Sequence, residues 1–184
     1  MSKPIEMLKS EHRVIEGALR TLDGICVKLQ GGIAVPPETL SQMLDFIRTY
    51  ADRFHHGKEE THLFPALEQK GIPRHGGPIG VMLSEHETGR ALVANLASAV
   101  EAYRQGDPSA VQRFVAAAWR YKDLLAMHIC KEESVLFMIA DDVLDAQVVA
   151  SLSEAFEQEN LTLGAGLHEE YERIAGELEK AWAA

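Results

Sequence analysis

Two short motifs each place an imidazole and a carboxylate one helical turn apart. His55 is followed by Glu59, and His128 is followed by Glu132, with three residues between the members of each pair. Residues i and i+4 share a helix face, so each pair would project from one side of its helix. Imidazole nitrogen binds iron, zinc or copper, and carboxylates favour harder ions. The spacing therefore indicates metal binding inside a helical protein.

Both motifs belong to an internal repeat. Ser10-Glu11-His12 recurs 74 residues later as Ser84-Glu85-His86, and the pattern HxxKEExxLF that starts at His55 recurs 73 residues later. Two related halves would bring their ligands together about a pseudo-twofold axis. Four histidines and two glutamates suit a non-haem di-iron centre, and the residues alone also allow zinc or manganese. The candidate metal ligands are His12, His55, Glu59, His86, His128 and Glu132.

These ligands require helices that hold them at one level. Apolar residues recur at steps of three and four, which predicts amphipathic helices separated by short connections rich in Gly and Pro. The predicted helices span residues 5–29, 38–70, 79–104, 109–140 and 147–182, the last with a break near Gly164 and Gly166. We therefore expect an all-α protein, an up-down-up-down antiparallel four-helix bundle with an additional C-terminal helix. Residues 1–140 would form the bundle, and residues 141–184 a helical extension packed on the same domain.

A structural interpretation competes with metal binding. A histidine on an apolar helix face is more often a core residue with a hydrogen-bond partner, and the six side chains could form a buried His–Glu network. Such a network would leave several ionisable groups unpaired in the core. Four histidines in register, two with glutamate partners and all duplicated, favour the metal site.

The dipeptide His55-His56 offers two possible ligands. The repeat aligns His55 with His128 and His56 with Ile129. In an α-helix, His56 also falls on the polar face, with Gln42, Thr49, Arg53 and Glu60. We therefore expect His55 to be the ligand.

Other side chains could do chemistry but have plainer interpretations. The weaker ligand candidates are His62, His168 and Glu159. Tyr50 and Tyr121 lie near the ligand level, where each could pack in the core or hydrogen-bond to a bound ligand. Free cysteine is among the most buried residue types, so Cys26 and Cys130 are expected in the core.

Composition excludes several classes of protein. The 184 residues are 46% hydrophobic and carry a net charge of −10, with no run of Lys and Arg for nucleic acid to bind. No apolar run approaches the ~18 residues that span a bilayer, and no secretory signal is visible. Two cysteines fit a reducing compartment. We expect a cytoplasmic protein without nucleic-acid or membrane partners; the oligomeric state stays open.

The order of the ligand motifs resembles the hemerythrin-like, HHE cation-binding family, in its bacterial di-iron members. The resemblance covers roughly residues 5–140 and includes Leu63-Phe64-Pro65. It implies a four-helix bundle holding two iron ions, oxo- or hydroxo-bridged, with the histidines as terminal donors and the two glutamates as bridges. Oxygen-carrying members have a fifth histidine one turn after the third ligand, where this chain has Arg90, and a later carboxylate than Glu132.

The resemblance implies a protein that binds or reacts with a small diatomic or peroxide ligand, O2, NO or H2O2. The symmetrical pattern is similar to di-iron proteins of nitrosative stress, so a role in oxidative or nitrosative stress is expected. The alternatives are a non-enzymatic iron or oxygen sensor, a metal-binding module, and a metal-free helical interaction protein. Whether the protein is an enzyme is left open.

Overall fold

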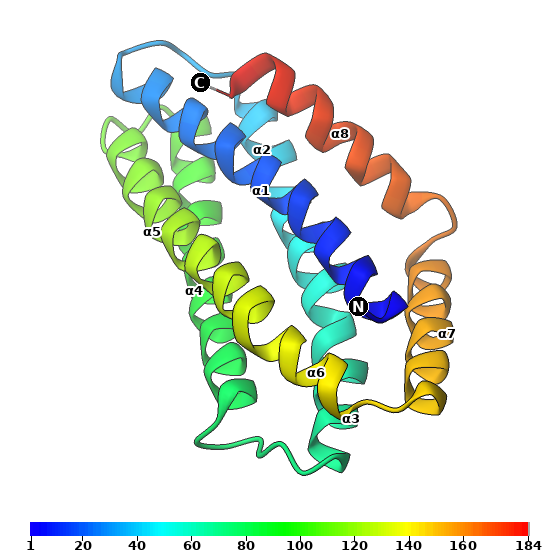
Figure 1. Ribbon diagram of the computed structural model, residues 1–184. Coiled ribbons are helices and arrows are strands. Elements are labelled where there is room, and N and C mark those ends of the chain that lie inside the picture. Colours follow the sequence, from blue (N-terminus) through cyan, green and yellow to red (C-terminus); the bar gives the residue numbers. More distant parts are fainter. Residues whose placement is uncertain (184) are drawn as a thin grey trace.

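The computed structural model describes residues 1–183 and confirms the all-α bundle. The chain first forms four long helical rods, each made of one or more consecutive helical segments, and these alternate in direction. The last two helices then run back along the first rod (Figure 1). The first rod is α1 (Lys3–Gln30), and the second contains α2 (Pro37–Phe46) and α3 (Phe64–Gln69). The third rod is α4 (Pro78–Arg104), and the fourth contains α5 (Ala110–Lys131) and α6 (Phe137–Val143). The C-terminal helices are α7 (Ala146–Leu163) and α8 (Leu167–Trp182).

Local sequence signals set the helix boundaries. Pro37 and Pro78 open α2 and α4, where proline's missing N–H costs nothing and its fixed φ suits the first turn. The Asp145 carboxylate caps α7 by accepting from the backbone N–H groups of Gln147 and Val148. Between α7 and α8 the chain turns through Gly164 and Gly166, whose φ values of 144° and 78° favour glycine. The predicted break in the last helix is therefore confirmed.

Both rods that carry the HxxxE motifs contain π-helical turns. These segments span Ile47–His56 and Glu59–Leu63 in the second rod, and Glu132–Leu136 in the fourth. A π-helical turn closes its hydrogen bonds at i→i+5, and such turns are frequent at functional sites. Because the turn is wider than an α-helical one, it rotates the side chains relative to the α-helical phase.

The buried interior consists of two apolar clusters with a polar layer between them. On α1, Leu8 belongs to one cluster and Ile15 to the other, and His12 lies between them. The same order holds on the fourth rod, where Leu125 and Leu136 belong to different clusters and enclose His128 and Glu132. Apolar packing on both sides thus holds the polar layer in place.

The C-terminal helices extend this arrangement. Both α7 and α8 pack against α1, and α8 runs along its length (Figure 1). Phe156 of α7 and Leu178 of α8 are buried in the two apolar clusters. Among residues 1–183, no helix combines the length and the apolarity needed to cross a bilayer.

Candidate metal centre

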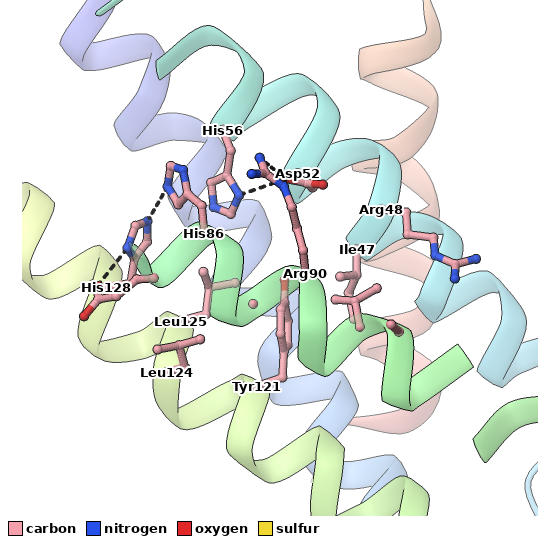
Figure 2. Close-up of a pocket in the computed structure, with 14 residues that line it drawn as sticks. Ile47, Arg48, Asp52, His56, His86, Arg90, Tyr121, Leu124, Leu125 and His128 are labelled. Carbon is pink, nitrogen blue, oxygen red and sulfur yellow. Dashed lines mark hydrogen bonds and ion pairs between the residues drawn. The ribbon is translucent and has the colours of Figure 1, made fainter. Parts of the chain in front are cut away.

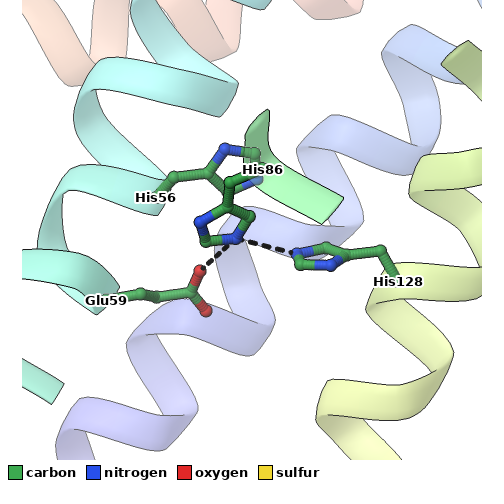
Figure 3. A group of neighbouring side chains, drawn as sticks. All are labelled: His56, Glu59, His86 and His128. Carbon is green, nitrogen blue, oxygen red and sulfur yellow. Dashed lines mark hydrogen bonds and ion pairs between the residues drawn. The ribbon is translucent and has the colours of Figure 1, made fainter. Parts of the chain in front are cut away.

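The six predicted ligands meet in the polar layer between the two apolar clusters. Their side chains are at most 1% exposed, and they come from all four rods of the bundle. They lie in two neighbouring groups whose candidate ligand atoms are within 4.8 Å of one another. One group contains His12, His55, Glu59 and Glu132. The other contains His56, Glu59, His86 and His128 (Figure 3).

Each of the two glutamates lies between two histidines, one from each half of the repeat. One oxygen of Glu59 is 3.6 Å from Nε2 of His55, and the other is 3.5 Å from Nε2 of His86. One oxygen of Glu132 is 3.2 Å from Nε2 of His12, and the other is 3.4 Å from Nε2 of His128. Each carboxylate can therefore offer one oxygen to each of two positions.

Every predicted histidine ligand is held from behind by a carboxylate. The four Nδ1 atoms lie 2.7 to 3.1 Å from carboxylate oxygens, in the pairs His12–Glu133, His55–Glu11, His86–Glu60 and His128–Glu85. A carboxylate accepts, so Nδ1 carries the hydrogen and the Nε2 lone pair points into the centre. This carboxylate–histidine arrangement is typical of metal sites, where it fixes the tautomer and the orientation of the ring.

A cation stands behind each of these carboxylates. Lys58 donates to Glu11, and Lys131 donates to Glu85. Arg13 donates to Glu133 and Arg90 to Glu60, both over 2.6 Å. Sequence reasoning did not assign these supporting residues, although the repeat contained the signal, because Glu11, Lys58 and Glu60 recur as Glu85, Lys131 and Glu133.

Burial and mutual charge set the protonation of the layer. Burial lowers the pKa of both His12 and His128 to about 4, so both are neutral donors at pH 7. Burial also opposes ionisation of Glu59, but the neighbouring imidazoles of His55 and His86 outweigh it and lower its pKa to about 2. Burial, together with the Glu59 charge, raises the pKa of Glu132 well above its usual value. Without metal, one of the two carboxylates therefore keeps a proton.

The pair of Nε2 atoms of His86 and His128 requires something positive between them. They are 3.2 Å apart, and both Nδ1 atoms face carboxylates, so two neutral rings would point their lone pairs at each other. Burial would lower the pKa of His86, but the neighbouring Glu59 and Glu60 carboxylates outweigh it and raise the pKa to about 9. A proton fills the gap at pH 7, and a metal ion would replace it.

The unsatisfied atoms of the protein concentrate in this layer. Among the described residues, seven buried side-chain N or O atoms have no hydrogen-bond partner. Five of them are His55 Nε2, His56 Nε2, both oxygens of Glu59 and one oxygen of Glu132. Buried polar atoms rarely lack partners, so a purely hydrogen-bonded network fits this layer poorly. Mixed imidazole and carboxylate donors fit transition-metal ions such as iron.

The expectation that His56 lies on the polar face is wrong. His56 is only 4% exposed, and its ring stacks on that of His86 with 3.8 Å between the centroids. Residues Ile47–His56 are π-helical, so the α-helical phase used for the prediction does not apply to them. His55 and His56 both face the interior and belong to different groups of the layer.

The weaker candidates lie outside both groups. His62 Nε2 is 3.5 Å from Glu159, and His168 Nε2 is 3.1 Å from Glu11, one of the supporting carboxylates. Tyr50 donates to Glu172 over 3.1 Å. Cys26 is buried as expected, whereas Cys130 is exposed, because its neighbours His128 and Glu132 face the interior and turn it outward.

A cavity of about 210 Å3 reaches the layer between α4, α5 and the second rod. His56, His86 and His128 form its inner end (Figure 2). The rest of its lining is mainly apolar and includes Ile47, Val93, Tyr121, Leu124 and Leu125. Arg90 also lines it and donates to both Asp52 and Glu60. The cavity therefore leads to one side of the polar layer.

Comparisons with known proteins agree with this geometry. The family described as the hemerythrin HHE cation binding domain matches residues 3–140. Uncharacterized proteins of Mycobacterium tuberculosis and Mycobacterium bovis are 27% identical to the chain over 154 residues, 84% of its length. The matched region covers 60% of those relatives, so the chain corresponds to only part of them. No solved structure matches.

Proposed function

The chain belongs to the hemerythrin HHE cation-binding family, and from this premise we propose that it holds a pair of iron ions that meet a small ligand. The ligand is a diatomic molecule or a peroxide: O2, NO or H2O2. When bound, two irons supply a redox-active pair that can exchange electrons with such molecules. The proposed ligands are His12, His55, Glu59, His86, His128 and Glu132.

The convergence of unpartnered donor atoms carries this proposal. Four imidazoles are aimed inward by the carboxylates behind them, and Glu59 and Glu132 each face two positions. Neutral imidazole and carboxylate donors stabilise iron, and metal binding would displace the protons held by His86 and Glu132. The residues behind the ligands keep each ring in the binding tautomer.

The cavity supports a small, uncharged ligand. Its apolar lining favours neutral molecules over hydrated ions, and it ends at His86 and His128. Near the histidines, Arg90 pairs with Asp52 and Glu60, and Glu85 pairs with Lys131, so these charges are compensated within the protein. The apolar lining also limits access of bulk water to the centre.

Metal content after anaerobic loading with Fe2+ and desalting tests the proposal. We expect two irons per chain, and a loss of two-iron loading in His55→Ala, His128→Ala and Glu59→Gln. His62→Ala and Glu159→Gln are matched controls outside the two groups and should load normally. Less than one iron per wild-type chain would refute the proposal, and full occupancy by zinc or manganese instead of iron would correct the metal.

A second candidate function is a non-enzymatic iron or oxygen sensor, which one contact favours. His168 of α8 bonds to Glu11, and Glu11 holds the Nδ1 hydrogen of His55. As a sensor, residues 1–140 would bind the metal pair, and residues 141–184 would respond to its binding through this contact. Decomposition of H2O2 or reduction of NO by the loaded protein supports an enzyme. An unchanged ligand, together with a large iron-dependent gain in stability, supports the sensor.

A further inference from the structure

We propose that His56 is a fifth histidine ligand, so that the two metal positions are unequal. One position would have His12 and His55, and the other would have His56, His86 and His128. The inference rests on the proposed two-metal centre and adds a ligand that the repeat does not predict.

His56 has the same arrangement as the four histidines of the repeat. Its Nδ1 lies 3.3 Å from a carboxylate oxygen of Asp52, one helical turn earlier. Its Nε2 is buried without a hydrogen-bond partner. One ring nitrogen of His56 belongs to a group of candidate donor atoms, formed with Glu59, His86 and His128, that lie within 4.8 Å of one another. Figure 3 shows the His56 ring beside that of His86, on the side away from Glu59.

The supporting residues extend to His56 as well. Arg90 donates to Asp52 over 2.9 Å and to Glu60 over 2.6 Å, so one guanidinium holds the carboxylates behind both His56 and His86. His56 thus has a carboxylate at Nδ1 and no partner at Nε2, the arrangement that metal-binding histidines have.

The repeat shows that this feature is confined to one half of the protein. With the offset of 73 residues, His56 corresponds to Ile129 and Asp52 corresponds to Leu125. Ile129 and Leu125 are both buried in the apolar core. The first half therefore has an imidazole and its carboxylate where the second half has two apolar side chains.

The extra histidine lies on the side that a small ligand reaches. His56, His86 and His128 line the cavity, whereas His12 and His55 are not among its lining residues. An incoming molecule would therefore meet the position with three histidines. The other position would lie behind the Glu59 and Glu132 carboxylates, enclosed by protein.

Proton NMR of the cobalt(II)-loaded protein counts the bound histidines directly. Each bound imidazole keeps its hydrogen on Nδ1 and donates it to a carboxylate, so each gives one strongly shifted signal that exchanges with solvent. We expect five such signals in the wild type and four in His56→Ile, which copies the residue found at the repeat position. His62→Ala should keep all five, and the ion at the three-histidine position should bind at least tenfold more weakly in His56→Ile.

Two results would overturn the inference, and both differ from failure of the proposed function. Four shifted signals in the wild type, or an unchanged count in His56→Ile, would show that His56 is not bound. Either result with two metals per chain leaves the two-metal centre intact, whereas fewer than two metals in the wild type refutes that centre itself. If His56→Ile does not fold, His56→Gln replaces it, and the same loss of one signal is expected.

Discussion

Replacement of Glu11 by Gln should destabilise the metal-free protein far more than the same change at its repeat partner, Glu85. Glu11 is 3% exposed and accepts from Lys58, whose side chain is fully buried. Glu85 accepts from Lys131, but that lysine is 38% exposed. The two ion pairs are thus equivalent in sequence and different in burial.

The burial of the lysine sets the magnitude. Glu11→Gln leaves Lys58 as an uncompensated buried charge, which costs about 3–5 kcal/mol of unfolding free energy. Glu85→Gln leaves Lys131 able to reach water, and such pairs contribute about 0–1 kcal/mol. Each change also removes the carboxylate that accepts from a proposed histidine ligand, His55 or His128, so each should weaken metal binding by about 10–100-fold.

Urea denaturation of the metal-free variants at pH 7 measures the stability difference, and chelator competition measures the metal affinity. The double variant Glu11→Gln/Lys58→Met tests the cause, because removing the stranded charge should restore most of the lost stability. Equal destabilisation by Glu11→Gln and Glu85→Gln would refute the reasoning, as would a double variant no more stable than Glu11→Gln alone.

Three further predictions concern the cavity, pH and α8. Gly89 lines the cavity, and a Cβ atom there would lie 3.8 Å from Tyr121 and 3.9 Å from Leu124, an ordinary contact. Gly89→Ala should therefore stabilise α4 by up to about 1 kcal/mol in thermal denaturation, whereas Gly89→Leu should fill the cavity and slow the stopped-flow reaction with NO. Because burial lowers the pKa of His12 and His128 from 6.5 to about 4, the unfolded chain binds more protons in this range. The metal-free protein should thus lose up to about 3 kcal/mol per histidine as pH falls from 6.5 to 4, and a flat profile in urea titrations would contradict this burial effect. His168→Ala should speed hydrogen exchange in α8 but keep two metals per chain, and loss of metal would make His168 part of the centre.

The helices and the convergence of the six side chains could be predicted because both follow simple periodicities. Apolar steps of three and four marked the rods, and the repeat placed four histidines and two glutamates at one level. The burial of His56 could not be predicted from an α-helical phase, since Ile47–His56 is π-helical. Its carboxylate, Asp52, looks like an ordinary polar position in the sequence.

The carboxylates that accept from the histidines could not be predicted from the sequence for a different reason. Glu11, Glu60 and Glu133 are each adjacent to a proposed ligand, where a charged helix residue usually faces solvent. Their role depends on which helix packs beside them: Glu60 of the first half holds His86 of the second, and Glu133 of the second half holds His12 of the first. Such hydrogen bonds between the two halves can be identified only once the relative placement of the rods is known.

Anomalous diffraction at the iron absorption edge, from crystals of the iron-loaded protein, tests the central claim most directly. Two peaks are expected in the polar layer, about 3.5–4 Å apart, the usual spacing of two-metal sites. One peak should lie beside His12 and His55 and the other beside His86 and His128, with Glu59 and Glu132 reaching both. A single peak in the layer, or iron bound only at a surface pair such as His62–Glu159, would contradict the account.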